Sequence, residues 1–150
     1  ISGAAVLAMP FVFTIGRALD RIGRRGGAAI VFTLTSIGCL GAYTLTSRPI
    51  LFVAVALAVF GASAVLPVLN AYNTELFPTH LRSDAFAWSN NLLGRIGYVL
   101  APIAVGRLAE DLGWGMAVAT TAVGPLVALA LVLRFLAETR GKELEETSKL

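Results

Sequence analysis

Long apolar segments alternate with short polar ones along the whole chain. Four of them, at 28–46, 50–72, 85–108 and 114–136, run for 19 to 24 residues, and a fifth, at 1–15, is shorter. A helix needs about 20 apolar residues to cross the hydrocarbon core of a bilayer. The segments lack the strict alternation of membrane strands. The pattern therefore predicts an all-α, polytopic transmembrane helical bundle, with a partial span at 1–15 and a polar tail at 137–150.

The composition favours a membrane protein and excludes several other classes. Hydrophobic residues make up 57% of the chain and charged residues 14%, and the mean hydropathy is +0.79. A soluble domain carries about 25% charged residues, so a soluble enzyme and a disordered tail are excluded. No His, Cys or carboxylate cluster has catalytic or metal-ligand spacing. We therefore expect no enzyme activity, no metal and no cofactor, and we expect Cys39 to pack as a small hydrophobic side chain.

Basic residues gather in the polar segments on one side of the predicted membrane. Segment 16–27 holds four arginines, segment 73–84 holds one, and the tail holds one more with two lysines. The opposite connections hold Arg48, with Arg107 at the end of a span. Because cytoplasmic loops carry the excess of Lys and Arg, we expect loops 16–27 and 73–84 and the tail to be cytoplasmic, in a plasma or inner membrane. The net charge of +3 then sets orientation, and no nucleic-acid partner is expected.

Three polar segments carry motifs. They read Gly-Arg-Ala-Leu-Asp-Arg-Ile-Gly-Arg-Arg at 16–25, Glu-Leu-Phe-Pro-Thr-His-Leu-Arg at 75–82 and Glu-Thr-Arg-Gly-Lys-Glu-Leu-Glu-Glu at 138–146. In this order, with two spans between successive motifs, they resemble the cytoplasmic motifs of the major facilitator superfamily of transporters. The resemblance is to its sugar-porter-like branch and to its organic-ion or aromatic-acid symporter branch. The chain departs from the pattern at Ala137, where these branches usually have Pro.

The resemblance implies a fragment of a secondary active transporter. The five spans would be the end of helix eight and helices nine to twelve, within the C-terminal six-helix half. Its partners would be the lipid bilayer, a missing N-terminal half, a small polar and anionic organic solute, and a proton or ion as co-substrate. The alternatives are a sugar transporter of the same superfamily, or a non-transporting receptor-like protein or inactive remnant.

The charged motif residues suggest a latch between helix ends. We expect Glu75 and Glu138 to pair with Arg17, Arg21 or Arg25 when the cytoplasmic side is closed, and to separate when it opens. Asp20 is expected to accept hydrogen bonds from a neighbouring guanidinium group or from a helix N-terminus. The alternative is that these charges only set topology. The candidate latch residues are Gly16, Arg17, Asp20, Arg21, Gly23, Arg24, Arg25, Glu75, Arg82, Glu138 and Arg140.

Arg95 is the charge nearest the middle of a predicted span. A cation there costs at least about 2.5–3.5 kcal/mol, so it must face a cavity or a partner. At 100° per residue, Trp88, Asn91 and Tyr98 share its stripe. We expect this stripe to bind the anionic solute, since related aromatic-acid and organic-anion transporters have an arginine in the corresponding helix. The alternatives are an ion pair with a span outside this chain, snorkelling, and, for Trp88 and Tyr98, ordinary packing.

Other polar residues within the spans carry less information. Ser89 and Asn90 are expected to point away from the Arg95 stripe. Asn70 is expected either to line the same cavity or to cap a helix end. Thr33, Thr35, Ser36 and Thr44 are expected to bond back to their own helix.

Overall fold

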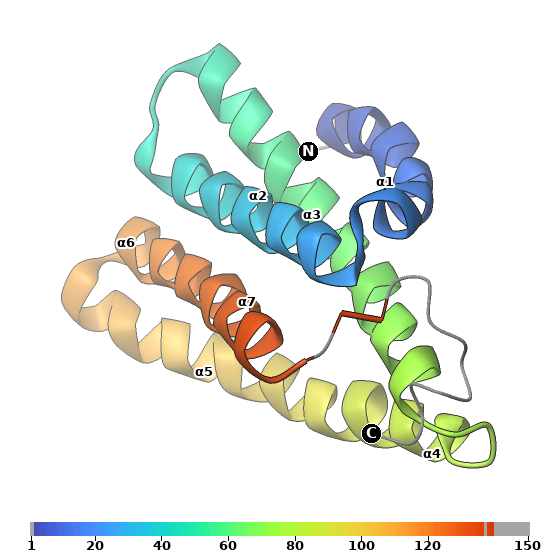
Figure 1. The fold of residues 1–150 in the computed structure, drawn as a ribbon. Helices are drawn as coiled ribbons and strands as arrows, with labels where there is room; N and C mark the ends of the chain where they lie inside the picture. The colour runs from blue at the N-terminus through green and yellow to red at the C-terminus, as the bar shows by residue number, and fades with distance from the viewer. Residues whose placement is uncertain (1, 137, 140–150) are drawn as a thin grey trace.

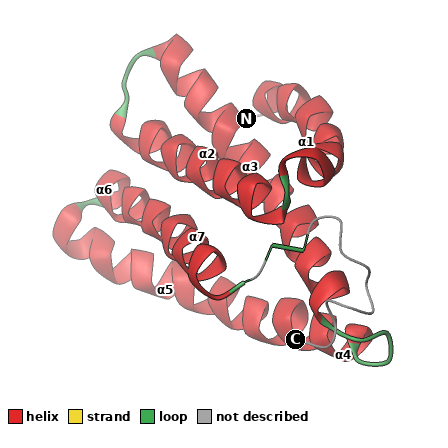
Figure 2. Cartoon of the chain, viewed as in Figure 1, coloured by secondary structure: helices red, strands yellow, loops and turns green. Residues whose placement is uncertain are grey.

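The computed structural model describes residues 2–136 and 138–139, and every regular element in that part of the chain is a helix (Figure 2). This confirms the all-α prediction. The main elements, arranged as in Figure 1, are α1 (Ser2–Ile22), α2 (Arg24–Thr44), α3 (Arg48–Leu76), α4 (Arg82–Phe86), η1 (Ala87–Leu93), α5 (Gly94–Leu112), α6 (Trp114–Ala119), η2 (Thr120–Ala122) and α7 (Val123–Phe135).

Four stretches of the described chain are long and apolar enough to cross a membrane. They are Arg24–Thr44, Arg48–Leu76, Arg82–Leu112 and Trp114–Phe135, with mean hydropathies from 1.4 to 2.5. The third joins α4, η1 and α5 into one continuous helical rod, and the fourth joins α6, η2 and α7. The chain is therefore a multi-pass membrane protein.

The helices extend further than the predicted spans, and the loops are correspondingly shorter. The predicted loop 16–27 is helical except at Gly23, and the predicted loop 73–84 shrinks to 77–81. We placed the ends of spans at charged residues, but a helix continues past the bilayer until its backbone geometry changes. That change comes at Gly23 and Gly113, whose φ angles are 100° and 76°, and before Pro78, which disfavours helix in the preceding residue.

Glycines bring α2 and α3 into close contact. A Cβ placed on Gly61 would overlap the side chain of Thr35, and one on Gly38 would overlap the backbone of Ala58. In lipid there is little hydrophobic drive to bring two helices together, so close packing across small residues supplies much of the attraction. The pair α2–α3 is thus held by contacts that only glycine permits.

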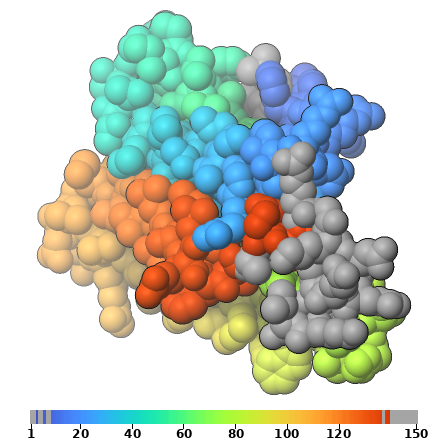
Figure 3. Space-filling view, viewed as in Figure 1, coloured from blue at the N-terminus to red at the C-terminus, as the bar shows by residue number. Residues whose placement is uncertain are grey.

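A second layer, made of α6, η2 and α7, lies against α2 (Figures 1 and 3). The buried hydroxyl of Ser36 donates to the carbonyl of Ala122 at 2.9 Å and so joins α2 to η2. Thr35 and Thr44 do bond back to their own helix, but the expectation for Ser36 was wrong. It could not be made from sequence, because it depends on which face of α2 meets the next layer.

The long helix α5 lies at the outside of the bundle. It packs on α6 and is separated from α2 by the α6–α7 layer (Figure 1). None of its residues is buried within the described part of the chain.

Four helices converge near Gly23 to form the main apolar core. Side chains of α1, α2, α3 and α7 meet there and place the ends of these helices side by side. The buried members are Ile15, Leu19, Ala28, Val31, Phe32, Ala64, Val68, Tyr72 and Val132.

Candidate functional site

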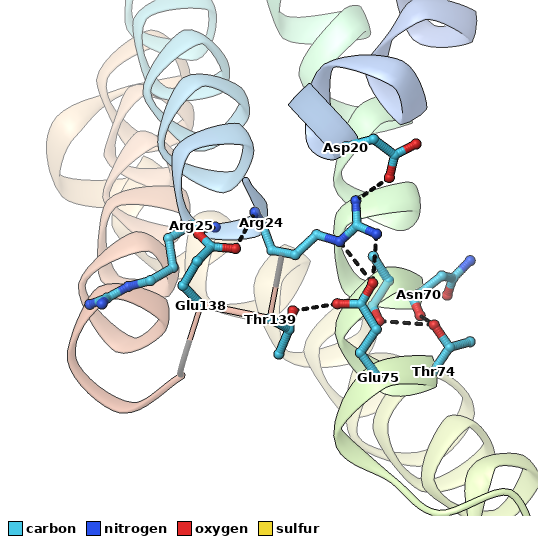
Figure 4. Close-up of polar contacts among 9 residues, drawn as sticks. Asp20, Arg24, Arg25, Asn70, Thr74, Glu75, Glu138 and Thr139 are labelled. Atoms are coloured by element: carbon cyan, nitrogen blue, oxygen red, sulfur yellow. Dashed lines mark hydrogen bonds and ion pairs between the residues drawn. The ribbon is translucent and has the colours of Figure 1, made fainter. Parts of the chain in front are cut away.

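Arg24 stands at the centre of a polar cluster directly beyond this core (Figure 4). Its Nε and Nη2 atoms lie 2.8 and 2.6 Å from one carboxylate oxygen of Glu75, and its Nη1 lies 2.6 Å from Asp20. The side chains of Arg24 and Glu75 are 17% and 12% exposed, whereas Asp20 is 68% exposed. The Arg24–Glu75 pair is therefore the strong, partly desolvated link, and Asp20 adds a solvated contact from the end of α1, on the other side of the reversal at Gly23.

Glu138 caps α2 from the far end of the sequence. Its two carboxylate oxygens accept hydrogen bonds from the backbone N–H groups of Arg24, at 2.8 Å, and Arg25, at 3.0 Å. These donors have no partner within the helix, and an anion is stabilised by the positive end of the helix dipole. The role we considered for Asp20 at a helix N-terminus is thus filled by Glu138.

Thr139 and Arg25 complete the cluster. The Thr139 hydroxyl donates to the second oxygen of Glu75, and Thr139 is buried. The Arg25 guanidinium donates to the carbonyl of Leu133 near the end of α7. In the segment after α7, Glu138 therefore binds the start of α2, and Thr139 binds Glu75 at the end of α3.

Gly23 makes this arrangement possible. It is the only residue between α1 and α2, and its φ of 100° and ψ of 160° lie in a region that is essentially restricted to glycine. A Cβ there would come within 2.8 Å of a Glu138 oxygen. Glycine is therefore required both by the reversal and by the approach of the carboxylate.

The structure brings together only part of the predicted latch. Arg24 pairs with Glu75, where we expected Arg17, Arg21 or Arg25 to do so. Within the described residues, the exposed Arg17 and Arg21 form no ion pair. Three further candidates also lie apart from the cluster or beyond the described chain: Gly16 is exposed on α1, Arg82 donates to the carbonyl of Phe77, and Arg140 lies outside the described residues.

Thr139 was missed by sequence reasoning. It follows Glu138 within the third motif, so that motif was the available signal, but an uncharged hydroxyl does not suggest a partner in the way that a charge does. The preference for Arg24 over its neighbours likewise follows from the direction in which α2 leaves Gly23, which the sequence pattern does not specify.

A second polar group surrounds Arg95 on α5. An open hollow of about 510 Å³ is lined by Asn90, Asn91, Arg95 and Tyr98, with Val99 and with Leu66 of α3. Trp88, which we predicted to join this group, does not line the hollow, whereas Asn90, which we predicted to point elsewhere, does. Asn70, which we expected either to line this cavity or to cap a helix end, does not line it.

The π-helix η1 explains this difference. Its wide turns bond each N–H to the carbonyl five residues back, as the Gly94 N–H bonds to Ser89. Positions before Leu93 are consequently rotated away from the 100° spacing that we assumed. The Asn73 amide also donates to the Ser89 hydroxyl at 3.0 Å, which ties α3 to η1 beside the hollow. No sequence signal for a π-helix was available.

The family comparison decides the class of protein. A model of the family described as Major Facilitator Superfamily matches residues 1–149. The chain belongs to the Major Facilitator Superfamily. The resemblance drawn from the three motifs is therefore confirmed, and the family is one of transporters rather than enzymes.

Curated relatives within this superfamily are longer than the chain. Solute carrier family 22 member 2 from Mus musculus is 31% identical over 146 residues, which are 96% of this chain and 26% of that protein, and its counterpart from Rattus norvegicus is 30% identical. "Putative niacin/nicotinamide transporter NiaP" from Bacillus subtilis (strain 168) is 27% identical over 91% of this chain and 34% of that protein. The chain thus spans about a quarter to a third of these relatives. No solved structure matches it.

Proposed function

We propose that the protein is a secondary active transporter that moves a small, polar, anionic organic solute by alternating access. The observation that carries this proposal is the placement of Arg95. It is the fourteenth of the 31 residues in Arg82–Leu112, and it lies beside Asn90, Asn91 and Tyr98 in an open hollow. In major facilitator transporters, substrate sites lie near the bilayer midplane.

The missing counter-charge favours an anionic solute. Among the described residues, no carboxylate forms an ion pair with Arg95, since Glu75 and Asp20 pair with Arg24 at a helix end. An unpaired cation in the middle of a span is costly. A guanidinium group binds a carboxylate through two parallel hydrogen bonds, and neighbouring amide and phenol groups suit the polar atoms of an organic acid.

The name of NiaP pairs niacin, an aromatic ring that bears a carboxylate, with its neutral amide nicotinamide, so it supports a small aromatic solute, and the choice of an anion rests on Arg95. We place the site for any coupling proton in the other part of the transporter, because the described spans carry no carboxylate near their middle. The solute would then be bound between this chain and the other half of the protein.

The cluster around Arg24 is proposed to act as the cytoplasmic latch of this transporter. The end of the bundle that holds Gly23 also holds Arg17, Arg21, Arg24, Arg25 and Arg82, whereas the other end holds Arg48 and Arg107. This asymmetry supports a cytoplasmic location. The cluster links the ends of α1, α2 and α3 with the segment after α7, so its closure would hold four helix ends together.

Uptake by the full-length protein tests the solute class. Vesicles carrying the wild type, Arg95→Ala or Arg107→Ala would be given a panel of monocarboxylic acids and neutral sugars. We expect Arg95→Ala to raise KM for the carried acid about tenfold or more, as the loss of a charge-assisted hydrogen bond predicts. Arg107→Ala, on the same helix but near its end, is expected to transport normally. If the wild type takes up neutral sugars and Arg95→Ala takes them up equally well, the proposal is contradicted and a sugar transporter is favoured.

A further inference from the structure

The last turn of α3 makes polar contacts in two directions. Glu75 binds Arg24 in the polar cluster, and the half-buried Asn73 donates from its amide to the Ser89 hydroxyl of η1 at 3.0 Å. Because two successive steps along a helix turn through about 200°, Asn73 and Glu75 lie on nearly opposite sides of α3. One turn of helix therefore contacts the latch on one side and η1 on the other.

The contact between Asn73 and Ser89 is the polar link from α3 to the rod Arg82–Leu112. Among the residues that the structure describes, it is the one hydrogen bond that joins the two. Packing of α3 on the rod is concentrated at α4, before η1 begins. A movement of the end of α3 therefore reaches η1 directly through this hydrogen bond.

Ser89 also closes the wide turn of η1 through its backbone. Its carbonyl accepts the Gly94 N–H, and the turn between these two residues contains Asn90 and Asn91, which line the hollow beside Arg95. Single turns of π-helix are rare and occur frequently at functional sites. An α-helical turn in its place would rotate Asn90 away from the hollow. The position of Ser89 therefore affects two of the side chains that face the proposed solute.

We propose that Asn73 and Ser89 are positioning residues that couple the latch to the solute site. While the latch is closed, the end of α3 is fixed, and Asn73 holds Ser89 where the η1 turn presents Asn90 and Asn91 to the solute. Opening of the latch moves Asn73, displaces this turn and lowers the affinity for solute. Linkage requires the converse, so bound solute favours the closed latch. The coupling rests on the proposed function, because it needs both the latch and the solute site.

The effect of Glu75→Gln, measured in the wild type and in Ser89→Ala, tests this coupling. Two quantities would be recorded on the purified full-length protein: the affinity for nicotinate, and the fluorine NMR resonance of fluorotryptophan at Trp88, assigned by its loss in Trp88→Phe. Trp88 precedes Ser89 in η1 and is exposed, so its resonance reports on the turn without any ligand.

Two further variants serve as controls. The Thr74 hydroxyl, between Asn73 and Glu75, donates to carbonyls of its own helix (Figure 4), so Thr74→Val removes a hydroxyl next to the link without breaking it. Ser89→Thr keeps the hydroxyl and should restore the behaviour of the wild type. Melting temperature would verify that each variant folds.

We expect Glu75→Gln to weaken nicotinate binding about fivefold, at the lower end of the usual coupling between two sites, and to shift the Trp88 resonance. In Ser89→Ala the same substitution should change the affinity by less than about twofold, as for independent sites, and leave the resonance in place. In Thr74→Val it should act as in the wild type. Equal effects of Glu75→Gln with and without the Ser89 hydroxyl would overturn the coupling, as would an unchanged Trp88 resonance in Glu75→Gln alone.

A failure of the proposed function gives a different result. If Arg95 does not bind the solute, Arg95→Ala binds nicotinate as the wild type does, yet the Trp88 resonance still responds to Glu75→Gln through Ser89. If only the coupling is wrong, Arg95→Ala weakens nicotinate binding, and the Trp88 resonance responds to Glu75→Gln equally in the wild type and in Ser89→Ala.

Discussion

At Gly23, α1 and α2 meet with no loop between them, and the carboxylate of Glu138 approaches the backbone so closely that no side chain fits. Gly23 therefore permits both the reversal of the chain and the capping of α2 by Glu138. The neighbouring Arg24 is held by the same junction, because Gly23 directs the start of α2 toward Glu75.

Substitution of Gly23 by Ala is expected to destabilise the protein by about 1–3 kcal/mol, since alanine is strained at this φ and its Cβ would displace Glu138. Gly16→Ala is the matched control. Gly16 lies within α1 with open space around it, so alanine there should be neutral or stabilising by up to about 1 kcal/mol. Thermal unfolding of the full-length protein in detergent would measure both, and equal melting temperatures for the two variants would contradict the role of Gly23.

The sequence predicted some residues of the Arg24 cluster and not others. The three motifs predicted that Glu75, Glu138 and arginines from the first motif would be neighbours, and the structure places Arg24, Glu75 and Glu138 together. The choice of Arg24 and the part played by Thr139 depend on directions set by helix ends. Those directions come from tertiary packing, which the spacing of charges does not encode.

The helices themselves are packed through small residues, and the pair α2–α3 shows this most clearly. Gly61 faces Thr35, and Gly38 faces the backbone of Ala58. In the sequence Gly61 begins a run of small residues, 61–64, that permits close helix approach, but the sequence does not say which helix approaches. Hydropathy therefore predicted the number and approximate place of the helices, whereas their ends and contact faces depended on glycine and proline geometry.

Gly61→Ala should separate α2 from α3 and destabilise the protein by about 1–3 kcal/mol, the usual range for overpacking a close interface. Gly124→Ala on α7, where a Cβ meets nothing within 4 Å, is the control and should change stability by less than about 1 kcal/mol. Melting temperatures of the two purified variants would decide this. A Gly61→Ala protein as stable as the wild type would mean that the helices have room to move apart.

The π-helix η1 is the element that sequence periodicity could not anticipate. It moves Asn90 to the hollow beside Arg95 and leaves Trp88 outside it. An assumption of uniform α-helix was enough to place Arg95 and Tyr98 together, since both follow η1, and it also placed Asn91 beside them although Asn91 lies within η1. It failed for the residues before them.

On the scale of the whole molecule, the two polar groups lie at different levels of the helical bundle. The Arg24 cluster joins helix ends, and Arg95 is near the middle of a long rod. This separation fits a transporter in which one group closes a side of the pathway and the other binds solute.

Glu75→Gln should open the end of the bundle that holds Gly23, because it removes the charge that Arg24 binds. In the full-length protein, lacking Cys39, a cysteine in place of the buried Ala28 would report this opening through its alkylation rate. The loss of a charged hydrogen bond predicts an acceleration of about tenfold. Glu110→Gln, which removes a carboxylate at the other end of the bundle, should leave the rate unchanged. Equal rates in both variants would contradict the latch.

The central claim, that Arg95 binds the anionic group of the solute, is tested most directly by equilibrium binding of a matched acid and amide. Nicotinate and nicotinamide share a ring and differ in the carboxylate that Arg95 is proposed to hold. With the purified full-length protein, Arg95→Ala should weaken the binding of nicotinate about tenfold or more relative to the wild type and leave that of nicotinamide unchanged, while Arg107→Ala should change neither. Tight binding of nicotinate by Arg95→Ala, or equal loss of the acid and the amide, would contradict the account.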